Sequence, residues 1–281
     1  MAPVPEATAT DPVISVTPVI SVNDVVVSYN GRRVLDGINL NISCGETMVL
    51  LGGSGSGKST LLRQIIGLER PQSGKILVNG VDLAKSTPKE LKKVRRSIGV
   101  AFQNAALFNS LSVEDNVALP LREHTQLAES TIRLMTWMKL AVVGLGESGK
   151  LSPQALSGGM KKRAAVARAI SLDPEILVFD EPSAGLDPIV AAELDELILG
   201  LKRAFNMTVV VVTHEMASAF RIADRMAMLY KGSMIAVGTK EELQSNPHPR
   251  IRQFFDRIPD PIADAAGIDQ YFQKYVEGSS A

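Results

Sequence analysis

The stretch Gly52-Gly-Ser-Gly-Ser-Gly57-Lys58-Ser59 decides the fold of this chain of 281 residues. It fits the pattern G-x-x-x-x-G-K-[ST], and it stands in the required context, after the apolar strand-like segment MVLL and before a segment with helical character. Glycines at these positions let backbone N–H groups wrap a phosphate, and the N-terminus of the following helix adds partial positive charge. The stretch therefore predicts a phosphate-binding loop.

Two side chains at the end of this loop indicate that the phosphate belongs to a nucleotide held together with a metal ion. Lys58 can bridge the β- and γ-phosphates, and the Ser59 hydroxyl can bind Mg²⁺. Further along, the apolar segment ILVF ends in two carboxylates, Asp180 and Glu181. The first can organise Mg²⁺, and the second can act as a general base for water. Many strands end in acidic turns, but downstream of a phosphate-binding loop this pair indicates nucleotide hydrolysis.

The segment Leu156-Ser-Gly-Gly-Met160 stands before a helical stretch with an apolar stripe, KKRAAVARAI. A Ser-Gly-Gly at a helix N-terminus is a second anion-binding device, although taken alone it also fits an ordinary helix cap. The chain thus offers two phosphate-binding devices and one complete nucleotide pocket. We therefore expect a head-to-tail homodimer in which each Ser-Gly-Gly closes on the nucleotide held by the other subunit.

Composition excludes several classes of protein. The chain has 45% hydrophobic residues, and its 30 basic and 30 acidic residues give zero net charge, which disfavours both a disordered chain and a nucleic-acid partner. Cys44 is the single cysteine, so no internal disulfide forms and a reduced, intracellular setting is expected. The longest uncharged run, residues 97–113, carries Gln103, Asn104, Asn109, Ser110 and Ser112, so no membrane span is predicted. The N-terminus does not fit a secretory signal.

Alternating strand and helix patterns predict an α/β sheet. The predicted strands cover residues 25–29, 38–42, 47–51, 75–78, 175–179, 207–213, 225–230 and 233–237. The predicted helices cover 58–67, 88–96, 189–205, 216–222, 240–245 and a short segment near 270–276. The string PVISV occurs twice near the N-terminus, and its second copy is expected to begin the first strand. We predict a disordered N-terminal extension at 1–17, a main domain at 18–258 with a helical subdomain at about 104–170, and a C-terminal extension at 259–281.

In order and spacing, these motifs resemble those of the ATP-binding-cassette (ABC) ATPases, over about residues 20–245. The resemblance implies an α/β fold of the P-loop NTPase class, an ABC-type nucleotide-binding domain with an antiparallel β subdomain and an inserted helical subdomain. It identifies residues 176–181 as the Walker B strand, residues 156–160 as the signature and the first motif as the Walker A loop. The Walker A residues implied to bind ATP are Gly52, Gly53, Ser54, Gly55, Ser56, Gly57, Lys58, Ser59 and Thr60.

Four further residues match shorter motifs of this family. By resemblance, Tyr29 in VSYNG stacks on adenine, and Gln103 in VAFQN senses Mg²⁺ and the attacking water and couples to a membrane partner. His214 in VVTHE contacts the γ-phosphate and positions water, and Asp187 in SAGLD shapes the dimer interface. Without the resemblance, each of three residues has a simpler interpretation. Tyr29 fits packing at a strand edge, Gln103 fits an ordinary loop residue, and His214 fits a structural histidine.

The resemblance therefore implies a complete set of site residues. The implied catalytic residues are Glu181, His214 and Gln103, and the implied Mg²⁺ ligands are Ser59, Gln103 and Asp180. Beyond the Walker A loop, the residues implied to bind ATP are Tyr29, Ser157, Gly158, Gly159 and Asp187, of which Ser157 and Gly159 contact the γ-phosphate across the dimer interface. The chain departs from the family at Met160, where Gln is usual. The departure puts only that side chain's hydrogen bond in doubt, and ATP hydrolysis is expected to survive it.

Within the family, three segments resemble the ATPases of the mammalian-cell-entry (MCE) lipid-transport systems, and the Mla phospholipid system in particular: LSGGM with the helix after it, residues 106–127, and residues 249–256. This resemblance implies a homodimer beneath an integral membrane permease, on the inner face of the cytoplasmic membrane. It also implies an MCE-domain lipid-binding protein and, in Mla-type systems, a STAS-domain accessory protein. The tail after Pro259, with Tyr271, Phe272 and Tyr275, fits either a partner contact or a frayed end.

Other classes within the family remain as alternatives. The main one is the ATPase of an importer for amino acids or other small metabolites. A DNA-repair member would carry a long coiled coil between Lys58 and Ser157, but in this chain Ser157 lies only 99 positions after Lys58. Translation-type members usually hold two cassettes, and this chain has one set of motifs. A non-catalytic module is disfavoured by the intact Glu181 and His214.

Overall fold

The computed structural model describes residues 17–259, and the chain divides into two compact units, one ending at Ser245 and one beginning at Asn246. The first strand begins at Ile20, inside the second PVISV copy, as predicted. The first copy, the helix predicted near 270–276 and the three tail aromatics lie outside the described residues. The domain boundaries drawn from the sequence stay a prediction.

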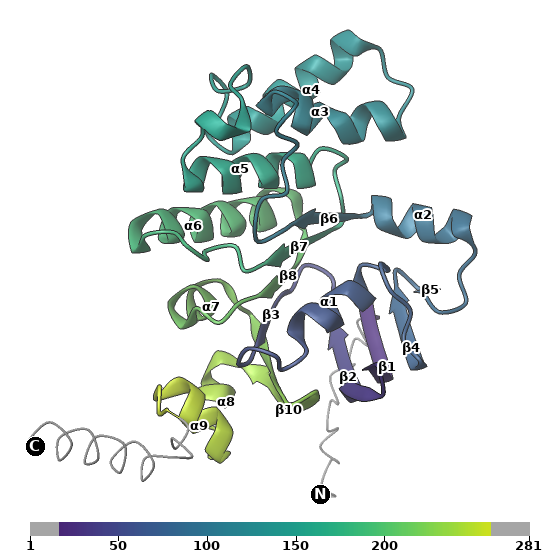
Figure 1. Cartoon of the computed structure of the whole chain (residues 1–281), viewed down its shortest axis with the longest axis vertical. Helices are drawn as coiled ribbons and strands as arrows, with labels where there is room; N and C mark the ends of the chain where they lie inside the picture. The colour runs from purple at the N-terminus through teal and green to yellow at the C-terminus, as the bar shows by residue number, and fades with distance from the viewer. Residues whose placement is uncertain (1–16, 260–281) are drawn as a thin grey trace, which may run out of the picture. The chain divides into compact units, whose positions relative to one another are not determined.

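A four-stranded antiparallel sheet in the order β2-β1-β4-β5 forms one layer of the larger unit (Figure 1). Its strands are β1 (Ile20–Tyr29), β2 (Arg32–Ile42), β4 (Ser73–Val78) and β5 (Val81–Asp82). Both of its tight hairpins turn on an Asn-Gly pair in the left-handed region, Asn30-Gly31 with φ of 51° and 78° and Asn79-Gly80 with φ of 50° and 77°. Asn-Gly suits both positions, because its left-handed conformation matches the twist of a two-residue hairpin.

A six-stranded sheet in the order β10-β9-β3-β8-β7-β6 forms the centre of this unit. Its strands are β3 (Thr47–Leu51), β6 (Ile98–Ala101), β7 (Ile176–Asp180), β8 (Thr208–Val212), β9 (Arg225–Tyr230) and β10 (Ser233–Thr239). All pairs are parallel except β9 with β10. Because β3 and β8 are buried along their whole length, they read as continuous apolar runs. The carboxyl ends of β3, β8, β7 and β6 share one edge, where ligands bind in open α/β sheets.

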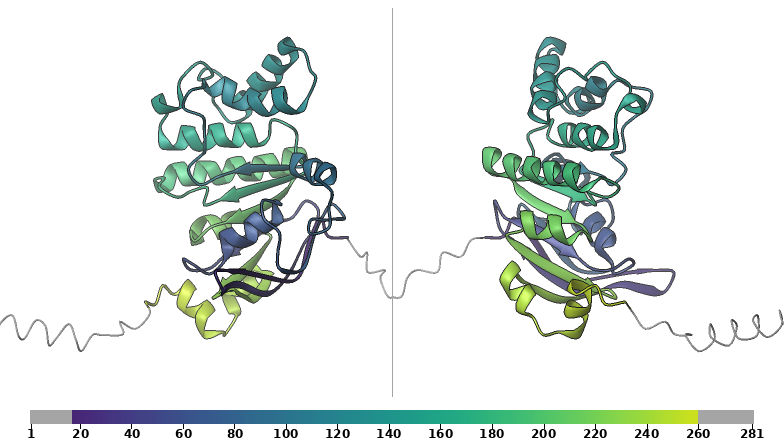
Figure 2. Two further views of the ribbon diagram at one scale, coloured as in Figure 1. Left: turned by 45° about the vertical axis from the view of Figure 1, so that its right-hand side comes forward. Right: turned by 90° about the vertical axis from the view of Figure 1, so that its left-hand side faces the viewer.

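Nine helices are present among the described residues. They are α1 (Lys58–Ile65), α2 (Pro88–Arg96), α3 (Val113–His124), α4 (Glu129–Val142), α5 (Gly158–Ala169), α6 (Pro188–Phe205), α7 (Met216–Ile222), α8 (Lys240–Ser245) and α9 (Pro249–Phe255), with a 3-10 turn at Pro153–Ala155. Helix α1 contacts β8 of the larger sheet and β2 and β4 of the smaller. Figures 1 and 2 show α3 and α4 beyond α5, away from the four-stranded sheet, as an inserted helical subdomain requires. Helix α5 packs on α3 and α4 and also on β6 and α6, so it links this subdomain to the sheet.

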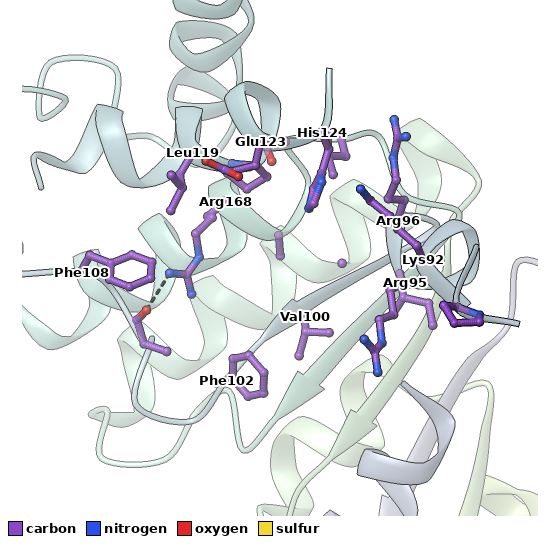
Figure 3. Close-up of a pocket in the computed structure, with 18 residues that line it drawn as sticks. Lys92, Arg95, Arg96, Val100, Phe102, Phe108, Leu119, Glu123, His124 and Arg168 are labelled. Atoms are coloured by element: carbon purple, nitrogen blue, oxygen red, sulfur yellow. Dashed lines mark hydrogen bonds between the residues drawn. The ribbon is translucent and has the colours of Figure 1, made fainter. Parts of the chain in front are cut away.

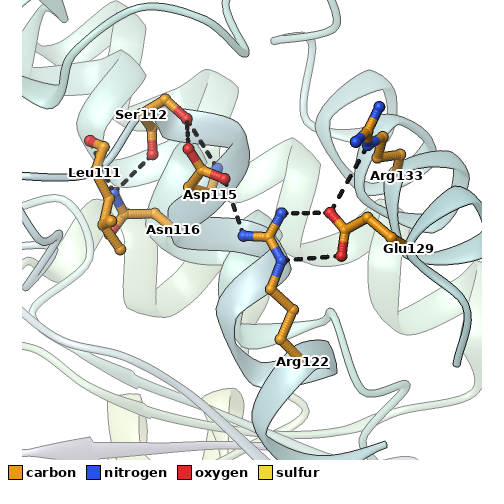
Figure 4. Close-up of polar contacts among 7 residues, drawn as sticks. All are labelled: Leu111, Ser112, Asp115, Asn116, Arg122, Glu129 and Arg133. Atoms are coloured by element: carbon orange, nitrogen blue, oxygen red, sulfur yellow. Dashed lines mark hydrogen bonds and ion pairs between the residues drawn. The ribbon is translucent and has the colours of Figure 1, made fainter. Parts of the chain in front are cut away.

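A polar cluster fixes the helical subdomain (Figure 4). The fully buried Asn116 accepts from Phe108 N at 2.7 Å and donates to Phe108 O at 3.0 Å and Ser112 O at 2.9 Å. The Arg122 guanidinium lies between Asp115 of α3, at 2.9 Å, and Glu129 of α4, at 2.6 Å. The hydrogen bond from the Ser112 hydroxyl and the contact with Arg122 hold the pKa of Asp115 below its usual value. The cluster therefore ties the loop at Phe108 to α3.

Replacing Asn116 by Ala is expected to destabilise the chain, because the part-buried backbone N–H and C=O of Phe108 lose their partner in the fully buried Asn116 side chain. Leaving a buried polar group unsatisfied costs about 1–3 kcal/mol. For a chain of this size each kcal/mol lowers the unfolding midpoint by roughly 2–4 °C, measurable by calorimetry. Asn109→Ala, at an exposed position in the same loop, is the matched control and should leave the midpoint nearly unchanged. Equal midpoints for the two variants would contradict this role.

Candidate functional site

The phosphate-binding loop lies between β3 and α1, as the sequence predicted. Gly52 has φ of 147°, and a Cβ there would lie 2.4 Å from Leu229 O; Gly57 has φ of 107°, and a Cβ there would lie 2.7 Å from Leu35 Cδ2. Neither position can hold a side chain, so the loop depends on glycine. Helix α1 begins at Lys58 with no side-chain cap and no acidic residue in its first turn. Its first backbone N–H groups are therefore available to an anion.

Lys58 spans this loop. Its ammonium donates to Gly52 O at 2.7 Å and to Gly53 O at 3.0 Å, and the residue is only 8% exposed. Burial lowers the pKa of Lys58, and the carboxylates of Glu181 and Asp180 act in the opposite direction. The positive charge of Lys58 therefore lies close to the carboxylates of Asp180 and Glu181, a position that suits a lysine that bridges phosphates.

Asp180 ends β7 with its Oδ1 atom buried and without a hydrogen-bond partner among the described residues. Burial raises the pKa of Asp180, the adjacent Glu181 raises it further, and nearby cations lower it. A buried carboxylate oxygen without a partner is costly and rare. Such an oxygen suits the coordination sphere of a hard cation, because Mg²⁺ prefers oxygen ligands.

Glu181 and His214 meet at the ends of β7 and β8. The Glu181 carboxylate, 12% exposed, lies 2.9 Å from His214 Nδ1 and accepts from His214 N at 3.3 Å. Glu181 has φ of 49°, and its own N–H donates to Val212 O at 2.8 Å. The structure therefore brings together two of the residues to which the sequence assigned catalytic roles.

Four other predicted site residues lie on β1, on α1 and in the turn after β6. Tyr29, at the end of β1, is 40% exposed, and its hydroxyl donates to the Glu69 carboxylate, which raises the pKa of Tyr29. Ser59 and Thr60 follow Lys58 in the first turn of α1. Gln103 is exposed in the turn that follows β6.

That turn is anchored by a residue that the sequence analysis missed. Ala105 and Ala106 have φ of 58° and 49°, and the Arg168 guanidinium of α5 donates to their carbonyls at 2.8 and 2.6 Å. Burial lowers the pKa of Arg168. The second Arg of the KKRAAVARAI helix was the visible signal, but only the packing of α5 on β6 shows its target.

The signature residues have a structural role within the subunit. Ser157 caps α5 by accepting from Met160 N at 3.3 Å, and Asp187 caps α6 by accepting from Ile189 N and Val190 N at 3.0 and 3.1 Å. A Cβ at Gly159 would lie 2.6 Å from Val190 Cγ1. Ser157 and Gly158 are exposed, and among the described residues no hydrogen bond or ion pair joins residues 157–159 to the phosphate loop.

A groove of about 810 Å³ lies between α2, β6, α3 and α5 (Figure 3). Phe102, Phe108 and Leu119 supply apolar lining, and Figure 3 shows the Arg168 guanidinium pointing into the same space. Lys92, Arg95 and Arg96 of α2 form a basic rim. The turn that carries Gln103 follows the carboxyl end of β6, and its residues Phe102 and Ala106 also line this groove. No helix in the described part of the chain is both long enough and apolar enough to span a bilayer.

Two curated relatives resemble the chain over most of its length. The intermembrane phospholipid transport system ATP-binding protein MlaF of Escherichia coli K12 is 43% identical over 266 residues, covering 94% of this chain and 99% of the relative. The probable ribonucleotide transport ATP-binding protein mkl of Mycobacterium tuberculosis is 44% identical over 237 residues, covering 84% of this chain but 66% of that longer relative. The first match confirms the predicted resemblance to Mla-type ATPases.

Solved structures and the family model agree with the fold. The structure of cbiO1 from Clostridium perfringens, part of an ABC transporter complex, has a TM-score of 0.76 at 30% identity, covering 85% of this chain and 99% of that one. A dimeric post-hydrolysis structure of the ATP-binding cassette MJ0796 bound to ADP and Pi has a TM-score of 0.72 at 30% identity, covering 78% and 98%. The family model "ABC transporter" matches residues 35–184. The chain belongs to the ABC transporter family, as one of its ATP-binding proteins.

Proposed function

We propose that this chain is the ATP-hydrolysing subunit of an ABC transporter that moves phospholipid across the cell envelope. The observation that carries the substrate class is the 43% identity to MlaF over 99% of that relative's length. The mycobacterial relatives named for ribonucleotide transport share less of their length with the chain, which favours phospholipid as cargo.

The site geometry supports ATP hydrolysis. The loop amides and Lys58 bind the β- and γ-phosphates, and Tyr29 stacks on adenine. Ser59 and Asp180, with Gln103, form the oxygen ligand set for Mg²⁺, and the unpartnered Asp180 Oδ1 fits that assignment. When bound, Mg²⁺ supplies positive charge at the transferring phosphoryl group.

Hydrolysis follows from the positions of Glu181 and His214. Glu181 accepts a proton from water as the water oxygen attacks the γ-phosphorus, and the bond from phosphorus to the β–γ bridging oxygen breaks, releasing ADP and phosphate. His214, 2.9 Å from the Glu181 carboxylate, aligns the water and contacts the γ-phosphate. Phosphoryl transfer depends on positioning and charge stabilisation more than on covalent chemistry.

A homodimer completes each site in this proposal. The exposed Ser157 and Gly158, with Gly159, meet the γ-phosphate held by the other subunit, and Asp187 lies at the same interface. The dimeric MJ0796 cassette, similar in fold, supports this arrangement.

The transport partners are proposed from the resemblance to Mla-type ATPases. The groove in Figure 3 receives a segment of the membrane permease. Apolar side chains of that segment contact the apolar lining of the groove, and acidic side chains of the segment pair with the basic rim on α2. Because the turn at Gln103 lies beside this groove, closure of the dimer moves the turn and, with it, the permease segment bound in the groove. An MCE-domain protein carries the lipid, and a STAS-domain protein completes the complex on the inner face of the cytoplasmic membrane.

The substrate class is tested by purifying the chain with its co-expressed membrane partners and identifying bound molecules by mass spectrometry. We expect phospholipid to copurify, and we expect added phospholipid, but not ribonucleosides or amino acids, to stimulate ATP turnover. Stimulation by an amino acid or another small metabolite, with no bound lipid, would replace the proposal by the importer alternative.

A further inference from the structure

Lys162, on the signature helix α5, contacts the backbone of the proposed catalytic base. Its ammonium donates to the main-chain carbonyl of Glu181 at 3.0 Å, in a half-buried position. Burial lowers the pKa of Lys162, and the nearby carboxylates of Glu181 and Asp180 act against this. Partial burial of the Lys162 ammonium costs solvation free energy, and its hydrogen bond to one carbonyl offsets only part of that cost. This suggests that the contact serves a specific role.

The carbonyl that Lys162 contacts belongs to a residue in an uncommon conformation. Glu181 has φ of 49°, in the left-handed region that side chains with a Cβ disfavour. Its N–H donates to Val212 O, and its carbonyl accepts from Ala184 N at 3.3 Å and from Lys162. Among the described residues, Lys162 is the one side chain seen to donate to this carbonyl. The backbone of Glu181 is therefore held in part by a residue of α5.

Helix α5 connects this contact to the signature. Ser157 caps its first turn, and Lys162 lies five residues further along the same helix. The N-terminal end of α5 is exposed at Ser157 and Gly158, whereas Ala164 to Ala167 are buried. Because α5 is one continuous helix, a displacement of its exposed N-terminal end also displaces Lys162.

We propose that Lys162 is a positioning residue that transmits the closure of the signature onto ATP to Glu181 of the same subunit. The inference rests on the proposed function, in which the signature of one subunit meets the ATP held by the other. Engagement at one site of the dimer would then orient the base at the second site. The residue acts through Glu181 and does not itself touch the reacting atoms.

The first test replaces Lys162 by Met, Gln or Arg in the full chain, assembled with its membrane partners. We expect Lys162→Met to lower kcat about tenfold, as for loss of a hydrogen bond from a charged donor, and Lys162→Gln, whose shorter neutral amide can still donate, to lower it less, with ATP affinity unchanged within about twofold in both. Lys162→Arg keeps a cationic donor and should restore most of the turnover. Lys161→Met, one residue earlier on the same helix and without a side-chain partner among the described residues, is the matched control and should behave as the unmodified chain.

A double-mutant cycle separates positioning from general support of the fold. If Lys162 acts through Glu181, Lys162→Met should cause no further loss in a Glu181→Gln background, measured in single turnovers with labelled ATP. A further tenfold loss there, or equal losses for the Met and Arg variants with a lowered unfolding temperature, would overturn the proposal. Unchanged kcat in Lys162→Met would also overturn it and leave ATP hydrolysis standing, whereas an unmodified complex without ATP turnover would refute the proposed function itself.

Discussion

Glu181→Gln is expected to lower ATP turnover by at least about a hundredfold while ATP binding persists, because general-base catalysis contributes roughly 10² to 10⁴ in rate. The amide has the size of the carboxylate and keeps an oxygen for the hydrogen bonds from His214, which the carboxylate makes at 2.9 and 3.3 Å. It cannot accept the proton of the attacking water. The variant should therefore accumulate in the ATP-bound, closed state.

Phosphate release measures turnover, and a fluorescent ATP analogue measures binding. Glu215→Gln is the matched control, because Glu215 lies 3.7 Å from the other ring nitrogen of His214 and is half exposed. That variant should keep near-normal turnover. Near-normal hydrolysis by Glu181→Gln would remove Glu181 from the base role.

Lys58→Ala is expected to weaken ATP binding itself, by at least about tenfold, because it removes a charge-assisted hydrogen bond to phosphate. In the structure the Lys58 ammonium lies 2.7 Å from Gly52 O and 3.0 Å from Gly53 O, at the centre of the phosphate loop. Among the described residues, no other side chain donates a hydrogen bond to these two carbonyls.

The dissociation constant of a fluorescent nucleotide, titrated at fixed ionic strength, checks this expectation. Lys75→Ala removes an exposed lysine from the unit that also holds the loop, and it should leave the constant unchanged. Unchanged affinity in Lys58→Ala, with a normal unfolding temperature, would mean that the loop does not hold the triphosphate as proposed.

The elements that the sequence predicted best are those with a strong local pattern. The loop at residues 52–57, the start of α1 at Lys58 and the apolar strand β7 ending in Asp180 agree with the structure. Strand β6 was missed, because IGVA lies in an uncharged run and has no alternation of polar and apolar residues. Gly99 within it reflects tertiary packing, since a Cβ there would lie 2.2 Å from Ala169 O of α5.

The contacts that the sequence could not predict are long-range ones. Arg168 reaches carbonyls 62 and 63 residues away, and Lys162 reaches one 19 residues away. Both depend on how α5 packs against the sheet, which no local propensity specifies. The pairing of the Tyr29 hydroxyl with Glu69 is of the same kind, because β1 and the segment that follows α1 are brought together by the fold.

The most direct test of the composite site is the mass of the purified full chain by light scattering, with and without ATP. Glu181→Gln should double in mass when ATP is added. The double variant with Ser157→Asp should bind ATP equally well but stay a monomer, because Asp still caps α5 while its charge repels the γ-phosphate. A dimer that forms without ATP, or one that forms equally well with Ser157→Asp, would contradict the account.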